Sequence, residues 1–230
     1  MPKTLAMIHT SLLFVQPDNI ISELFNELMP DVRRINIIDD ALLSDVMKVG
    51  KITPDVQQRM THYVKSAELT GADAVLMLCS SLGPALDEGR SQAKIPVIKI
   101  DDAMTEKAVC DADAVAGKIG VMATVATTLG PTVELIEEKA KKLNKPVTVK
   151  HHLVAGAFET MMAGNRAKHD EMILGAAGAL AGDVDLIVLA QASMSRLAAQ
   201  IQEQTGLPVL SSPRLAMEYT KKVLETGVKP

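Results

Sequence analysis

Eight short runs of aliphatic and β-branched residues recur along the chain, and polar turn-forming segments separate them. Hydrophobicity within each run is nearly continuous instead of alternating, which is typical of strands covered on both faces of a parallel sheet. The pattern predicts strands over residues 4–10, 34–39, 74–81, 95–101, 118–124, 147–154, 185–193 and 207–212.

Longer segments between these runs carry apolar residues at helical spacing. They predict helices over residues 18–29, 53–69, 130–144 and 195–206. Pro54 and Pro131 suit the first turn of a helix, because a proline there removes no intrahelical hydrogen bond. Strands and helices alternate throughout, which indicates βαβ units and an α/β fold with doubly wound parallel sheets.

The chain also repeats itself weakly. Laying "GADAVLMLCSSLG" over "GDVDLIVLAQASM" aligns Cys79 with Gln191. The openings of the two halves, "MIHTS" and "VMATV", align Thr10 with Thr124. We therefore expect two pseudo-symmetric lobes, with the last helix packing back on the first: residues 1–102 plus 213–230 form one lobe and 103–212 the other.

Composition and charge exclude several classes of protein. The 230 residues carry a formal net charge of −4, only 2% are aromatic and none is tryptophan, so neither a basic face nor a stacking platform for nucleic acid is expected. The start of the chain does not resemble a signal peptide, and no uncharged run reaches the roughly 20 residues of a membrane helix. Two cysteines are too few for a disulfide framework. We expect a cytoplasmic protein with no nucleic-acid or membrane partner.

Small polar residues follow several of the predicted strands, and this is where chemistry is expected. Ligands of open parallel sheets bind beyond the carboxyl ends of the strands. The expectation is therefore a cleft between the lobes, which these residues line: Thr10, Ser11, Cys79, Ser80, Ser81, Thr124, Thr127, Gln191, Ala192 and Ser193. A lone cysteine is often only a small core residue. Its place at a strand end before two serines favours a functional role for Cys79, whereas Cys110, in an alanine-rich helical segment, is interpreted as structural.

Three short motifs resemble the aspartate/glutamate/hydantoin racemase superfamily. "LCSSLG" is similar to its first cysteine loop, "GVMATVATT" to the loop that opens its second lobe, and "VLAQASM" occupies the position of its second cysteine motif, usually "LGCTxM". The resemblance implies two α/β lobes, a cofactor-independent reaction without metal, and a small carboxylic acid as substrate. It also implies a homo-oligomer and a cysteine from each lobe beside the substrate carbon.

This sequence departs from the family pattern at one position, where Gln191 stands in place of the second cysteine. An amide cannot transfer a proton, but it can donate a hydrogen bond to a substrate oxygen. Cys79 alone would then serve as acid and base, which suits a racemase- or isomerase-type proton transfer at the carbon next to the carboxylate, or decarboxylation or lyase chemistry of a malonate-like acid.

Two further alternatives stay open. Histidine titrates in a suitable range, so His9 is an alternative second base; one of the adjacent His151 and His152 could also face the cleft. The chain could instead be a non-catalytic binder of a small acid. Arg90 and Arg196 occupy similar positions in the two halves and are interpreted as residues on solvated helix faces. The alternative is that they bind a substrate carboxylate.

Overall fold

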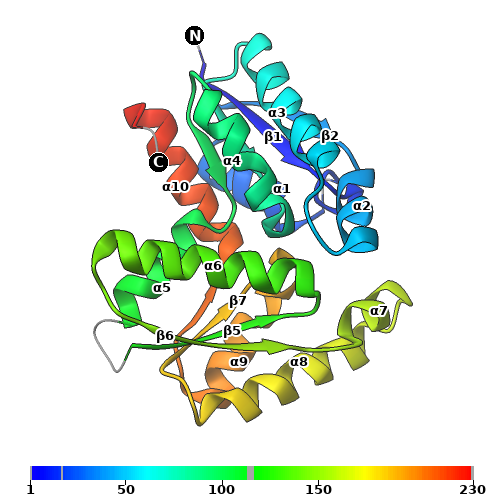
Figure 1. Ribbon diagram of the computed structural model, residues 1–230, viewed down its shortest axis with the longest axis vertical. Helices are drawn as coiled ribbons and strands as arrows, with labels where there is room; N and C mark the ends of the chain where they lie inside the picture. The colour runs from blue at the N-terminus through cyan, green and yellow to red at the C-terminus, as the bar shows by residue number, and fades with distance from the viewer. Residues whose placement is uncertain (1, 17, 113–116, 229–230) are drawn as a thin grey trace. The chain divides into compact units, whose positions relative to one another are not determined.

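The computed structural model describes residues 2–16, 18–112 and 117–228. They fold into two compact units (Figure 1). The first unit consists of the chain up to Ile100 together with the chain from Pro213 onward, and the second is Asp101–Ser212. Each unit has its own sheet and its own buried core.

The first unit contains a four-stranded, fully parallel sheet in the order β2-β1-β3-β4. Its hydrogen bonds pair Ile8 of β1 with Met77 of β3 and Met7 with Asn36 of β2. Because all four strands are parallel, their carboxyl ends meet at one edge of the sheet. The strands are β1 Thr4–His9, β2 Arg33–Ile38, β3 Ala74–Met77 and β4 Val97–Lys99.

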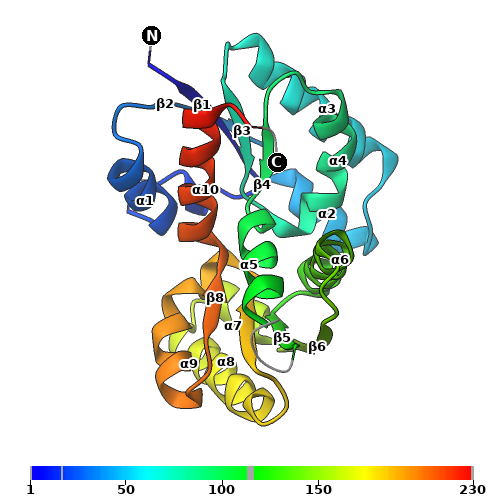
Figure 2. The ribbon, with the colours of Figure 1, turned by 90° about the vertical axis from the view of Figure 1, so that its left-hand side faces the viewer.

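Helices cover both faces of this sheet. On one face, buried side chains of α2, α3 and α4 pack against Ile8, Val75 and Met77. On the other face lie α1 and α10 (Figure 2), where Arg214 of α10 pairs with Glu27 of α1 at 2.9 Å. The helices are α1 Ile20–Leu28, α2 Ala41–Val49, α3 Pro54–Leu69, α4 Gly83–Gln92 and α10 Ser212–Thr226, with 3-10 helices η1 Leu12–Phe14 and η2 Ser80–Leu82.

The second unit repeats the same plan, with a four-stranded parallel sheet in the order β6-β5-β7-β8. Helices α5 and α6 lie on one face and α8 and α9 on the other (Figure 1). The elements are β5 Lys118–Ala123, β6 Thr148–Leu153, β7 Leu186–Leu189 and β8 Val209–Ser211, with α5 Asp102–Ala112, α6 Ala126–Leu143, α7 Ala157–Met162, α8 Arg166–Ala181, η3 Ala192–Leu197 and α9 Ala198–Thr205.

A glycine in β5 lets helix α8 approach the sheet closely. A Cβ atom on Gly120 would lie 2.8 Å from Leu180 Cδ2 and 3.0 Å from Val184 Cγ2. Contacts this short are not tolerated in packed interiors. Any larger residue in place of this glycine of the "GVMATVATT" motif would therefore force the Leu180 and Val184 side chains to shift.

The predicted fold class and all eight predicted strands are confirmed, and α3 begins at Pro54 as expected. The expectation that every strand is covered on both faces is wrong for β2 and β6, edge strands whose residues are all exposed or half-buried. The placement of Pro131 in a first turn is also wrong, because α6 starts at Ala126 and encloses the proline. Among the described helices, none is long and apolar enough to cross a membrane.

Candidate functional site

Cys79 occupies the turn between β3 and the helix that follows. It caps η2 in an extended conformation, with φ −148° and ψ 113°, and its carbonyl accepts a hydrogen bond from the Leu82 amide at 3.2 Å. Ser80 and Ser81 form the first turn of η2 and are buried, 8% and 2% exposed. The sequence "LCSSLG" thus passes from a strand to a helix start within a few residues, with the thiol at the junction.

The side chain of Cys79 is half-buried and packs against the core face that carries Ile8 and Met77. Thr10 follows β1, the neighbour of β3, and is 6% exposed. Side chains alternate along a strand and Ile8 is the register partner of Met77, so the continuation of both strands puts Thr10 and Cys79 on the same side. Cys110 is exposed on α5 and forms no disulfide with Cys79.

Lys99, which the sequence analysis did not single out, ends β4 and is almost fully buried. Its ammonium group forms an ion pair with Asp87 of α4, Nζ to Oδ1 2.7 Å. Its stem lies against the start of α4, where a Cβ atom on Gly83 would be 3.5 Å from Lys99 Cδ. A lysine inside the aliphatic run "IPVIKID" was the available signal, because lysine is seldom buried without a partner.

His9 lies on the opposite face of the first sheet from Cys79. It follows Ile8 in β1, is 1% exposed, and its Nε2 lies 3.0 Å from Asn36 Oδ1. Burial lowers the pKa of His9; the hydrogen bond to Asn36 opposes this and the charge of Arg34 adds to it. His9 is therefore neutral at pH 7. Of the histidines in β6, His151 is exposed and His152 half-buried.

Gln191 holds the same position in the second unit as Cys79 in the first. It follows β7 and caps η3 in an extended conformation, with φ −124° and ψ 134°. Its Oε1 accepts hydrogen bonds from the Thr124 amide at 2.5 Å and from Thr124 Oγ1 at 2.9 Å. A backbone amide can only donate, so this contact fixes which end of the side-chain amide is oxygen. Gln191 Nε2 has no hydrogen-bond partner among the described residues.

The first turn of α6 supplies further donors in the second unit. Val125 caps this 18-residue helix without a side-chain hydrogen bond, and the first amides of a helix attract anions. Thr127 lies in that turn, and its Oγ1 is buried without a hydrogen-bond partner among the described residues. Ala192 and Ser193 are half-buried at the start of η3.

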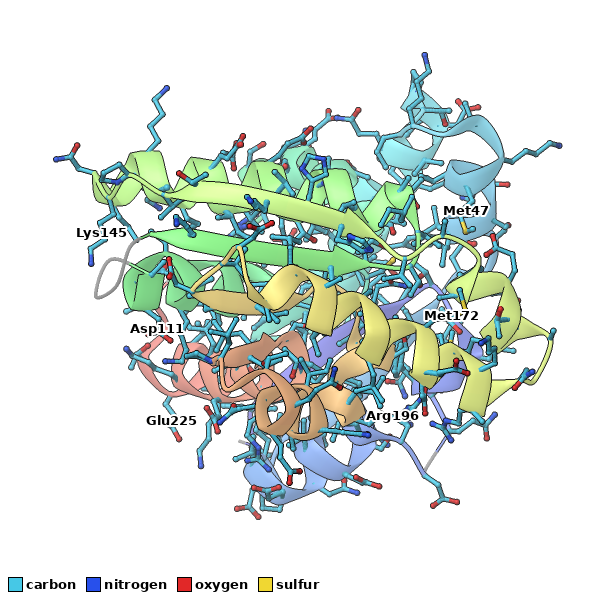
Figure 3. All side chains as sticks on the ribbon, turned by 90° about the horizontal axis from the view of Figure 1, so that it is seen from below. Met47, Asp111, Lys145, Met172, Arg196 and Glu225 are labelled. Carbon is cyan, nitrogen blue, oxygen red and sulfur yellow. The ribbon has the colours of Figure 1, made fainter. Side chains whose placement is uncertain are left out.

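Arg196, at the end of η3, does not offer its guanidinium to a substrate in this structure. Both of its terminal nitrogens donate to Asp170 of α8, and Figure 3 shows Arg196 beside that helix. Arg196 is exposed on η3, so its reading as a solvated helix residue is confirmed, with Asp170 as its partner. Arg90 is half-buried on α4 and also has an interaction partner.

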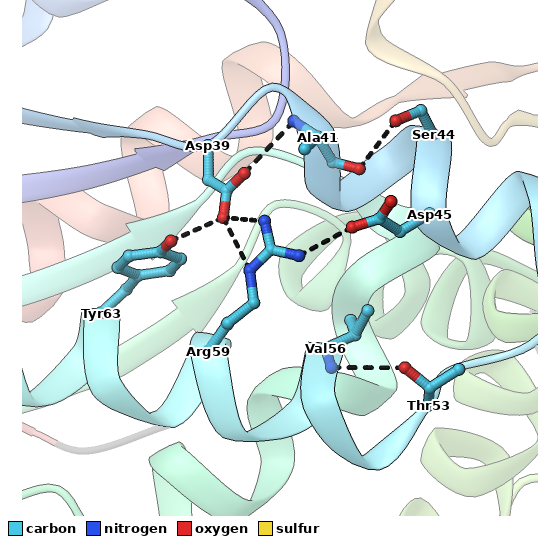
Figure 4. A network of polar contacts seen from close by, with 8 residues as sticks. All are labelled: Asp39, Ala41, Ser44, Asp45, Thr53, Val56, Arg59 and Tyr63. Carbon is cyan, nitrogen blue, oxygen red and sulfur yellow. Dashed lines mark hydrogen bonds and ion pairs between the residues drawn. The ribbon is translucent and has the colours of Figure 1, made fainter.

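A polar network follows β2 in the first unit (Figure 4). Asp39 accepts hydrogen bonds from Tyr63 Oη at 2.5 Å and from Arg59 Nε at 3.1 Å, and Asp45 accepts from Arg59 Nη1 at 2.7 Å. Burial raises the pKa of Asp39, but the hydrogen bonds from Tyr63 and Arg59 outweigh it and the pKa lies below its usual range. The network ties β2, α2 and α3 together. Within residues 2–16, 18–112 and 117–228 no group of three or more His, Cys, Asp or Glu side chains is placed to hold a metal ion.

Comparisons with solved structures show that this architecture recurs. Allantoin racemase from Klebsiella pneumoniae matches with a TM-score of 0.70 at 17% identity, over 99% of this chain and 89% of that one. A glutamate racemase from Bacillus anthracis matches with a TM-score of 0.68 at 17% identity, over 98% and 83%. Unliganded arylmalonate decarboxylase matches with a TM-score of 0.55 at 16% identity, over 99% and 95%. At these identities the likeness shows the fold.

Sequence comparison carries the assignment further. A search of curated proteins found no match. The sequence profile described as Asp/Glu/Hydantoin racemase matches residues 19–220, which include all the predicted site residues except His9, Thr10 and Ser11. The chain therefore belongs to the Asp/Glu/Hydantoin racemase family.

Proposed function

We propose that this protein is a cofactor-independent enzyme that moves a proton at the carbon next to the carboxylate of a small carboxylic acid. Cys79 is the group that takes or returns that proton. The observation that carries the proposal is the position of Cys79 at the start of η2, half-buried and next to two serines in a chain of this family. A helix start favours the thiolate over the thiol, which makes a thiol usable as acid or base near neutral pH.

The donors proposed for substrate binding follow from the charge that develops. Removing a proton beside a carboxylate produces a dianionic enediolate, which needs several hydrogen-bond donors around its oxygens. The second unit offers Gln191 Nε2, Thr127 Oγ1 and the first amides of α6. The backbone N–H and the hydroxyl of Thr124 both donate to Gln191 Oε1, so the proposed role of Thr124 is to hold the Gln191 side chain. Ser80, Ser81, Ser193, Ser11 and Thr10 remain the other proposed binding residues.

Decarboxylation or lyase chemistry is the second candidate, and Gln191 is the observation that favours it. Racemisation by two bases requires a second titratable group on the far side of the carbon, and Gln191 has none. Loss of CO₂ followed by protonation of the enediolate needs only one acid, which Cys79 can supply. The fold is shared with a decarboxylase as well as with racemases, so both reactions belong in the same experiment.

The experiment incubates the protein in D₂O with a panel of amino, hydroxy and malonate-type acids, each as a single enantiomer where one exists. We expect ¹H NMR to show deuterium entering the carbon next to the carboxylate, or CO₂ release, for at least one acid. Cys79→Ala should reduce the rate by about 10² to 10⁴-fold, the usual contribution of a proton-transferring group. Cys110→Ala is the matched control and should leave the rate unchanged. Binding of an acid without exchange, indifferent to Cys79→Ala, would identify a non-catalytic binder and refute the proposal.

A further inference from the structure

Three side chains of the second unit form a connected cluster outside the proposed chemistry. His169 Nδ1 lies 2.8 Å from Asp170 Oδ1, Arg196 Nη1 donates to Asp170 Oδ2 at 2.6 Å, and Arg196 Nη2 donates to Asp170 Oδ1. His169 and Asp170 belong to α8 and Arg196 to η3. The cluster therefore joins the helix layer to the segment that starts with Gln191.

The protonation state of the cluster follows from its contacts. The hydrogen bonds from Arg196 lower the pKa of Asp170 most, and they outweigh the burial that raises it, so Asp170 is a carboxylate and can only accept. The imidazole nitrogen that faces it must carry a hydrogen, which makes Nδ1–H the donor. His169 is fully buried, with 0% of its surface exposed, and its Nε2 has no hydrogen-bond partner among the described residues.

A buried nitrogen without a partner costs free energy, and so does a fully buried imidazole. In return, the carboxylate of Asp170 is fixed in place. His169 Nδ1 donates to Oδ1 from the same helix, and the guanidinium of Arg196 donates to both carboxylate oxygens. Such bidentate pairing imposes one geometry on both partners, which a lysine cannot do. The side chain of Asp170 is 22% exposed and that of Arg196 31%, so the pair is partly shielded from solvent.

The segment from Gln191 to Arg196 is held at both of its ends. At the first end, Thr124 fixes the oxygen of Gln191 through two hydrogen bonds. At the other end, Asp170 fixes Arg196. Between them lies η3, a 3-10 helix of 6 residues in which Met194 and Leu197 are buried.

We propose that His169, Asp170 and Arg196 form a positioning relay for Gln191: α8 holds η3 through the Asp170–Arg196 fork and so keeps the Gln191 Nε2 donor in its working orientation. The inference rests on the proposed role of Gln191 and names the residues that support it. None of the three is assigned a contact with substrate. They are positioning residues.

The test uses the full-length protein and two readouts. In ¹H–¹⁵N spectra, the side-chain amide signals of Gln191, assigned with Gln191→Asn, should shift or broaden in Arg196→Ala and Asp170→Asn and be partly restored in Arg196→Lys. Arg214→Ala is the matched control, because Arg214 forms a similar two-nitrogen fork on Glu27, both contacts 2.9 Å, in the first unit. It should leave the Gln191 signals unchanged. Circular dichroism and thermal unfolding confirm that each variant is folded.

The second readout is a double-mutant cycle on the exchange or decarboxylation rate. Arg196→Ala should lower kcat by about 10- to 100-fold, the effect of a small misplacement of a working group, and should have no further effect in a Gln191→Ala background. Unchanged Gln191 signals in a folded Arg196→Ala protein overturn the inference, and so do additive effects in the cycle. A protein that is inactive on every acid refutes the proposed function, while the amide signals still decide for or against the relay.

Discussion

The side-chain oxygen of Gln191 accepts two hydrogen bonds from Thr124, one from its amide and one from its hydroxyl. These contacts join the ends of β5 and β7, the two central strands of the second sheet. The residue that replaces the expected cysteine is therefore rigidly held and presents an N–H donor instead of a thiol.

Gln191→Glu tests that donor. The glutamate keeps an oxygen for Thr124 but replaces Nε2 with a second acceptor, which repels a substrate carboxylate. We expect kcat/KM to fall by about 10² to 10³-fold, the effect of losing one donor to an oxyanion, with thermal stability little changed. Kinetics on the acid found in the D₂O screen provides the measurement. An unimpaired Gln191→Glu enzyme would show that Nε2 does not serve the reaction.

Gln191→Cys restores the thiol that the family pattern contains. If two-base chemistry is prevented only by the absence of a second titratable group, this variant should racemise a single enantiomer of the acid. Chiral chromatography measures the appearance of the other enantiomer. Gln191→Ser is the control, because it is equally small and has no group that titrates near neutral pH. Equal behaviour of the two variants would mean that the second thiol has no role at this position.

His9 makes stability depend on pH in a defined window. Its pKa in the folded protein is lowered, so below its ordinary value of about 6.5 the unfolded chain binds a proton that the folded chain does not. The free energy of unfolding should therefore fall as the pH is lowered below about 6.5. Urea unfolding between pH 5 and 8 should show a shallower loss for His9→Gln than for the wild type. His62→Gln, at an exposed position on α3, is the control for replacing a histidine by glutamine.

Gly120→Ala should destabilise the second unit, because its Cβ would lie 2.8 Å from Leu180 Cδ2. We expect a loss of about 1–3 kcal/mol, typical of an overpacked core. Gly130→Ala is the control: this helix position has nothing within 4 Å of the added Cβ, and alanine should stabilise it by up to about 1 kcal/mol. Denaturant unfolding measures both, and a Gly120→Ala protein as stable as the wild type would contradict the packing argument.

The hydrogen bonds of the Asp39 network stabilise the first unit. Tyr63→Phe removes a hydrogen bond to a charged group and should cost about 1.5–3 kcal/mol. Since the pKa of Asp39 is lowered, the stabilisation is present above the ordinary carboxyl pKa near 3.9 and is lost as the pH falls through the lower folded value. Chemical unfolding at pH 7 and at pH 3 should show a smaller difference between Tyr63→Phe and wild type at the lower pH.

The strands could be predicted, and so could the position of the polar residues that follow β1, β3, β5 and β7, because both signals are local: continuous apolar runs, and polar residues directly after them. The errors were also local in origin. Lys150 and His151 interrupt the apolar run of β6 and already indicate an edge strand, and Pro131 conceals a helix that starts five residues earlier.

The hydrogen-bonded partners could not be predicted from local patterns. Thr124 and Gln191 are 67 residues apart, and Asp170 and Arg196 are 26 apart. Their contacts depend on the register of β5 with β7 and on how α8 lies against η3. Neither the strand register nor the helix packing can be deduced from a short stretch of sequence.

The composition of the first unit has a consequence for synthesis. Its helix α10 contributes Ala216, Met217 and Val223 to the buried interior, yet it is encoded after the whole of the second unit. During synthesis, all residues of the second unit are therefore available before α10 can complete the core of the first unit.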